Sequence, residues 1–176
     1  MIAKTLITFS ELLDDHLKRV FNLTESIVYL QSIMNNSISQ MPDNKIHIFL
    51  SNIERETAGG ITSQRQALGN MQKNASPEWN LNLYVMISAC FNAKQYEMAL
   101  RSISTVACFL QANNHFVLQG KNAKIQVEPV NLSTSELSNL WSINGNQYYP
   151  SLFCLMRNVL IDSDEINRLD TRIRQI

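Results

Sequence analysis

The side chains that could perform chemistry are few and lie far apart in the sequence. The three cysteines are Cys90, Cys108 and Cys154, and no histidine lies within four residues of any of them. Metal-binding motifs place their ligands at short, fixed spacings, and the spacing of the histidines here matches none of them. The sequence therefore predicts no metal site and no cofactor, although a cluster that only the fold assembles stays open. The histidines are His16, His47 and His115.

Two groups could in principle carry an enzymatic reaction. Glu54 and Glu56 flank Arg55 at the end of a predicted strand, where they could share a face and act as acid and base. Cys90 could act as a nucleophile if a histidine and an acid lay beside it. Neither group has such a partner in the sequence, so we expect no catalytic residue and read Cys90 as a buried, reduced thiol.

Composition excludes several classes of protein. The chain has 176 residues, a length that favours a single domain. Its 15 Lys and Arg balance its 15 Asp and Glu, which predicts no binding to nucleic acid or to an anionic membrane surface. No apolar run is long enough to span a membrane. Only 17% of the residues are charged, and a net charge near zero favours association with other proteins.

Apolar periodicity predicts the main secondary-structure elements. Apolar residues at three- and four-residue spacing predict an N-terminal helix that ends near Asn22. Strict alternation over Leu81–Phe91 predicts a central strand, because both faces are largely non-ionic. The segment Glu54–Pro77 has no sustained period and predicts a long loop. Shorter runs predict four further strands, at Ile27–Leu30, Lys45–Ile53, Lys124–Val127 and Ser151–Ile161.

Two capping patterns place helices between these strands. Asn92 followed by Gln95 predicts the start of a second long helix, and Ser133 followed by Glu136 is a capping box that opens a short one. This order of elements predicts an α+β fold. Its sheet is mixed and mainly antiparallel, flanked by the N-terminal helix and the second long helix.

We assign residues 1–162 to a single domain and residues 163–176 to an amphipathic C-terminal tail. Three groups of segments along this domain share their order and spacing with a known family. They are Leu50–Glu56; Leu81–Tyr84 with Tyr96, Ala99–Leu100 and Phe109–Gln111; and Leu137–Trp141 with Gly145, Tyr149–Ser151 and Arg157. Through this set, residues 2–162 resemble the N-terminal domain of the tube-terminating cap proteins of phage-tail-like contractile injection systems. Virulence-cassette and antifeeding-prophage particles are examples of such injection systems.

The resemblance implies a tail-terminator-like fold and a structural, non-enzymatic role. Such a protein is expected to form a ring, most simply a hexamer, that ends growth of the inner tube and sheath distal to the baseplate. The implied partners are further copies, the inner tube protein and the sheath protein, without nucleic acid and without membrane insertion. Assembly in the cytoplasm, followed by incorporation into the particle, is the implied localisation. The alternatives are an assembly adaptor at the baseplate, and a small cytoplasmic enzyme that uses Glu54 and Glu56 or Cys90.

The candidate contact elements are the Glu54–Pro77 loop and the C-terminal tail. Arg157 lies in an apolar predicted strand, and we expect it to form a structural ion pair with Glu54 or Glu56, because a buried charge needs a partner. The candidate interface residues are Gly59, Gly60, Arg65, Ile166, Leu169, Ile173 and Ile176.

Overall fold

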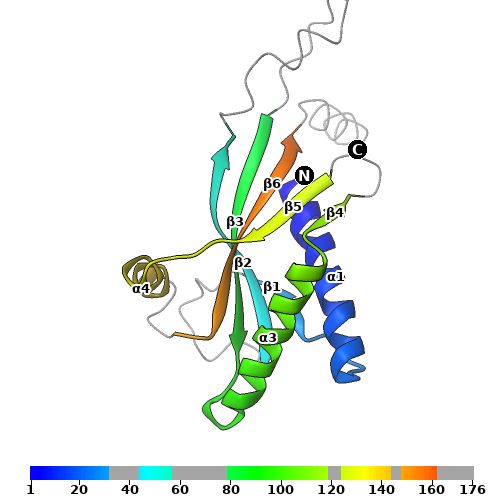
Figure 1. Ribbon diagram of the computed structural model, residues 1–176, viewed down its shortest axis with the longest axis vertical. Helices are drawn as coiled ribbons and strands as arrows, with labels where there is room; N and C mark the ends of the chain where they lie inside the picture. The colour runs from blue at the N-terminus through cyan, green and yellow to red at the C-terminus, as the bar shows by residue number, and fades with distance from the viewer. Residues whose placement is uncertain (32–43, 57–78, 119–123, 144–147, 162–176) are drawn as a thin grey trace, which may run out of the picture.

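A computed structural model of the chain describes residues 1–31, 44–56, 79–118, 124–143 and 148–161. Within these ranges the fold is a curled six-stranded sheet with helices on both sides (Figure 1). None of the described helices is both long enough and apolar enough to cross a membrane. The predicted α+β class is confirmed, with a mixed sheet that is mainly antiparallel.

The strand order is β1-β2-β3-β6-β5-β4. β1 pairs with β2 in parallel, and the other neighbouring strands are antiparallel. β3 lies inside the sheet, as its alternating apolar pattern predicts, with Ile87 opposite Ile48 of β2 and Leu152 of β6. The strands are β1 (Val28–Leu30), β2 (Lys45–Arg55), β3 (Trp79–Cys90), β4 (His115–Val117), β5 (Lys124–Pro129) and β6 (Ser151–Ile161).

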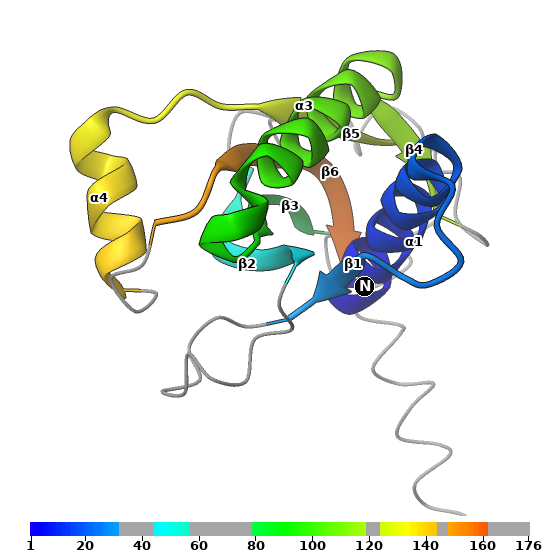
Figure 2. The same ribbon diagram turned by 90° about the horizontal axis from the view of Figure 1, so that it is seen from below.

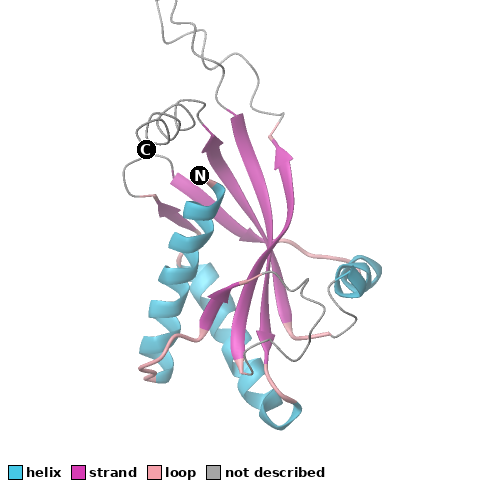
Figure 3. Cartoon of the chain, turned by 180° about the vertical axis from the view of Figure 1, so that it is seen from behind, coloured by secondary structure: helices cyan, strands magenta, loops and turns pink. Residues whose placement is uncertain are grey.

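Helices α1 (Ile2–Phe21) and α3 (Tyr96–Ala112) lie on one side of the sheet, and α4 (Thr134–Ile143) lies on the other (Figures 2 and 3). α1 ends at Asn22, whose left-handed backbone (φ 52°) lets its N–H bond to the carbonyl of Lys18. The predicted cap of the second long helix is present, since Asn92 Oδ1 accepts the N–H of Gln95 at 3.1 Å. That cap opens a short 3-10 helix, η2 (Ala93–Gln95), which leads into α3.

The main core lies between the sheet and the two long helices. α1 buries one stripe of apolar side chains, and α3 contributes Phe109, whose ring lies 6.3 Å from that of Phe9. This burial, and not intrinsic helix propensity, supplies most of the stability of such helices. The largest fully buried side chains are Phe9, Leu13, Leu17, Ile46, Ile48, Leu83, Met86, Ile87, Leu110, Leu118, Ile125 and Met156.

Two features differ from the sequence-based expectation. β2 continues past the predicted Ile53 to Arg55, so Glu54 belongs to a strand and not to a loop. The short strand β4 has no counterpart among the predicted elements. The rest of the expected loop, residues 57–77, and the tail 163–176 lie outside the described residues.

Candidate functional site

Arg157 and its two predicted partners, Glu54 and Glu56, lie on the sheet face opposite α1 and α3. Arg157 Nε donates to Glu128 Oε1 at 2.7 Å, and its Nη1 lies 3.7 Å from Glu56 Oε2. The hydrogen bond to Glu128 holds the pKa of Arg157 above its ordinary value. The side chain of Arg157 is 40% exposed, so the expected reason for pairing, a buried charge, does not apply.

Glu54 lies on the same face but is bonded to neutral groups. Its Oε2 accepts the hydroxyl of Tyr84 at 3.0 Å, and its Oε1 accepts the side-chain amide of Asn52 at 3.1 Å. The bond to Glu54 raises the pKa of Tyr84, because ionising the phenol would remove the donor. Glu56 also accepts the side-chain amide of Asn82, at 2.8 Å. The carboxylates of Glu54 and Glu56 thus both accept hydrogen bonds from neighbouring side chains of the sheet.

A β-bulge in β6 places Arg157 in this cluster. Leu81 pairs with Val159 and Leu83 with Met156, so Asn82 faces both Arg157 and the following residue, Asn158. Asn158 has a left-handed backbone with φ 66°, a conformation that asparagine tolerates better than most residues. The extra residue lets Met156 and Val159 both enter the core while Arg157 points to the opposite face.

Glu128 is the member of this cluster that sequence reasoning missed. The alternation of Lys124 and Gln126 with Ile125 and Val127 already predicts that Glu128 lies on the solvated face of β5. The pairing of Gln126 with Arg157 then brings Glu128 beside the guanidinium. Only the long-range register between β5 and β6, which the local pattern does not encode, joins the two charges.

An aromatic cluster lies between α4 and the same sheet face. The ring of Trp141 packs edge-on against Phe49 at 6.4 Å and against Tyr149 at 5.8 Å. Trp141 is buried, and its indole N–H has no hydrogen-bond partner among the described residues. α4 starts at the predicted capping box, in which Glu136 Oε2 accepts the N–H of Ser133 at 2.8 Å and its hydroxyl at 2.6 Å. This cluster holds α4 against the sheet.

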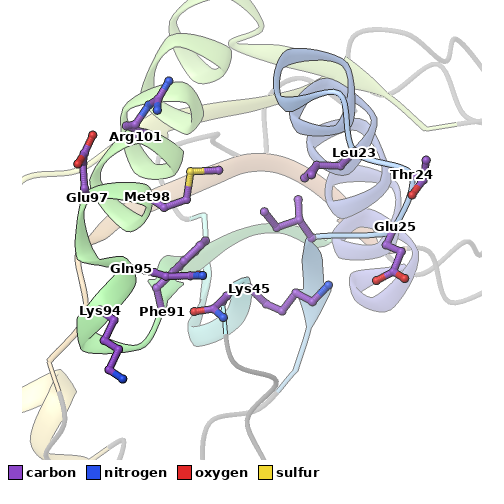
Figure 4. A pocket seen from close by; sticks show the side chains of 12 residues that line it. Leu23, Thr24, Glu25, Lys45, Phe91, Lys94, Gln95, Glu97, Met98 and Arg101 are labelled. Carbon is purple, nitrogen blue, oxygen red and sulfur yellow. The ribbon is translucent and has the colours of Figure 1, made fainter.

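A cleft of about 690 Å³ lies on the other side of the sheet, at the end of the helical layer (Figure 4). One wall is the segment after α1, and the other is η2 with the first turns of α3. Its lining combines apolar side chains with charged ones. The lining residues are Leu23, Thr24, Glu25, Ile27, Asn44, Lys45, Phe91, Lys94, Gln95, Glu97, Met98 and Arg101.

The two buried cysteines lack the lowered pKa of a reactive thiol. Cys90 and Cys154 are buried, and burial raises the pKa of Cys90 to about 11 and that of Cys154 to about 12. Cys108 is exposed on α3. No group of His, Cys, Asp and Glu among the described residues is arranged to hold a metal ion.

The candidate interface residues of the predicted loop and tail all lie outside the described part of the chain. They are Gly59, Gly60, Arg65, Ile166, Leu169, Ile173 and Ile176, and their role as contacts stays a prediction. Candidate contact surfaces among the described residues include the charged sheet face, which carries Arg157, Glu56 and Glu128, the α4 side and the cleft.

Comparison with known proteins gives one family and two similar folds. Residues 7–175 match the family described as the Pvc16 N-terminal domain. The cryo-EM structure of a PVC sheath/tube terminator, from an extracellular contractile injection system in the extended state, has a similar fold. Its TM-score is 0.60 and its sequence is 17% identical, over 92% of this chain and 56% of that one.

The tube-terminating cap of the anti-feeding prophage is also similar, with a TM-score of 0.51 and 14% identity. That match covers 86% of this chain and 55% of the cap. At these identities the likeness shows the fold, and the chain spans just over half of the length of either protein. No protein of curated function matches the sequence.

Proposed function

The chain belongs to the Pvc16 N-terminal domain family, and we propose that it is a tube terminator of a contractile injection system. In this role it is a structural cap subunit that forms a ring, most simply a hexamer, at the distal end of the inner tube and sheath. The ring stops the growth of both. The observation that carries the proposal is the fold shared with a sheath/tube terminator over 92% of this chain.

The cap needs three kinds of contact, with further copies, with the inner tube protein and with the sheath protein. We propose no nucleic-acid partner, because equal numbers of acidic and basic residues leave the chain without net positive charge, and we propose no insertion into a membrane. Assembly takes place in the cytoplasm, and the cap is then part of the finished particle.

A structural cap needs no catalysis. The side chains that an enzyme would use here, Cys90, Glu54 and Glu56, are in environments that do not favour a reaction. A Cys90 thiol with a pKa of about 11 is almost wholly protonated near neutral pH, and the thiolate is the nucleophilic form. Glu54 and Glu56 accept hydrogen bonds from Tyr84 and Asn82, which hold them in structural positions.

Deletion of the gene in the producing strain tests the proposal. We expect tubes and sheaths of unregulated length by electron microscopy, and restoration of uniform length by the wild-type gene supplied on a plasmid. The Cys90→Ser variant removes the candidate nucleophile of the enzymatic alternative, and it should restore length equally well. Uniform tube length in the deletion strain would refute the terminator role.

The position of the protein on isolated particles separates the cap from a baseplate adaptor. A gold-labelled tag on this chain should mark the end of the particle distal to the baseplate. Label at the baseplate end would favour the adaptor, whose loss should prevent tube initiation and not tube termination.

A further inference from the structure

We propose that the end of α4 of one copy docks into the cleft between the segment after α1 and the start of α3 of the next copy, and that this contact, repeated, closes the ring. The inference deepens the proposed terminator function and rests on its ring. It names the surfaces that meet and the occupant of the cleft, which is a second copy of this chain.

The inserted element is the C-terminal end of α4. This helix packs at one side of the sheet, on the face opposite α1 and α3 (Figures 1 and 2). Ile143, at its end, is 66% exposed, and Tyr148, which packs on Trp141 at 6.0 Å, is 60% exposed. These are the two most exposed large hydrophobic side chains of the described residues. Tyrosine is one of the residue types enriched at interface hot spots, and an exposed isoleucine adds apolar area that association can bury.

The cleft offers an apolar floor for these anchors. Phe91 and Ile27 form its buried part, and Met98 lines the wall that α3 provides (Figure 4). Burying exposed apolar area on both partners supplies the driving force for association.

The charges of the two surfaces are complementary. Lys45, Lys94 and Arg101 line the cleft with two acids, Glu25 and Glu97, so its charged side chains sum to a small positive charge. The end of a helix carries a partial negative charge on its free carbonyl groups. α4 has no basic residue in its last turn to offset that charge. The end of α4 is therefore better matched to this cleft than a basic helix end would be.

The positions of the two surfaces require a second copy. α4 packs on the sheet face that carries Phe49 and Met86, whereas α1 and α3 cover the opposite face. The end of α4 cannot reach the cleft of its own chain through the sheet. A contact between two different surfaces of identical subunits is heterologous, and it generates a ring when the rotation between subunits closes.

Two surface variants of the full chain test the contact by sedimentation velocity over a range of concentrations. Ile143→Asp alters only the α4 end, and the double variant Lys94→Glu/Arg101→Glu alters only the cleft. We expect each to weaken self-association tenfold or more relative to wild type. The matched controls, Val117→Asp on β4 and Lys124→Glu on β5, should change it less than about twofold. Circular dichroism spectra and melting temperatures identify any variant that does not fold.

Mixing the two variants gives the sharper result. The Ile143→Asp copy keeps its cleft and the double variant keeps its α4, so one intact contact remains between them. We expect a one-to-one dimer and no larger species, because the remaining surfaces of that dimer are both altered.

Several outcomes would overturn the proposal. They are a wild-type chain that is monomeric at every concentration, variants that associate as wild type does, and a mixture without dimers. If Ile143→Asp left self-association intact but abolished binding to isolated tubes, the occupant would be the tube protein. None of these results depends on tube length in the deletion strain, so this proposal and the terminator function can fail separately.

Discussion

The carboxylate of Asp14 on α1 accepts the backbone N–H of Val28, the first residue of β1, at 3.0 Å. The same oxygen accepts the N–H of Ile27 at 2.8 Å, and the other oxygen lies 2.7 Å from Nζ of Lys18. Asp14 is buried, and these donors satisfy its charge where water is largely excluded. The long N-terminal helix is thereby joined to the edge strand of the sheet.

Removing this carboxylate should destabilise the domain. Asp14→Ala leaves two backbone N–H groups without their acceptor, and we expect a loss of about 3 kcal/mol in the free energy of unfolding. The adjacent exposed residue gives the matched control, since Asp15→Ala should change stability by less than about 0.5 kcal/mol. Urea unfolding followed by circular dichroism measures both. Equal effects of the two substitutions would show that the bonds to Ile27 and Val28 contribute little.

The same group should make stability depend on pH. Burial raises the pKa of Asp14, but the hydrogen bonds from Lys18, Val28 and Ile27 outweigh it and hold the pKa below the ordinary value of 3.8. A lowered pKa in the folded state means that the stabilisation is complete above about pH 5 and is lost as the pH falls through that lowered value. The difference in unfolding free energy between wild type and Asp14→Ala should therefore shrink between pH 6 and about pH 3. A difference that stays constant over that range would contradict the assignment.

The ion pair on the charged sheet face should contribute little to stability. Arg157 and Glu128 have side chains that are 40% and 37% exposed, and solvent screens pairs at such positions. A double-mutant cycle with Arg157→Met and Glu128→Gln should give a coupling energy of about 0.5 kcal/mol at low salt, and less in 1 M NaCl. A coupling energy above about 2 kcal/mol would show that the pair is structurally essential.

Thiol reactivity should separate the cysteines. At pH 8 a thiol with a pKa of about 11 or about 12 is ionised to about one part in a thousand or less, so buried Cys90 and Cys154 should resist Ellman's reagent. Exposed Cys108 should react quickly, and the other two only after unfolding in urea. Cys108→Ser should abolish the fast phase. A fast phase that survives this substitution would reveal a reactive thiol at Cys90 or Cys154.

Local patterns predict most of the fold because the main elements bury regular stripes. The period of α1, the alternation in β3 and the capping box of Ser133 and Glu136 are each encoded within a few residues, and all three are present. β4 has only three residues, lies at the sheet edge and leaves Val117 exposed, so it gives no pattern to detect.

Features set by long-range register were harder to predict. β2 extends to Arg55 because Glu54 and Arg55 pair with Asn82 and Leu81, which lie beyond the undescribed part of the chain. The contact between Arg157 and Glu128 likewise depends on how β5 and β6 align. The cleft brings together the segment after α1 and the start of α3, and no local sequence signal specifies that meeting.

The topology places α4 in a connection between two neighbouring strands. β5 and β6 are hydrogen-bonded neighbours, and α4 is inserted in the connection between them. Trp141 ties this insertion to the sheet through Phe49 and Tyr149, whereas Ile143 at its end is exposed. Under the contact proposed above, a change at the exposed end of α4 alters which subunits associate and leaves the order of the strands as it is.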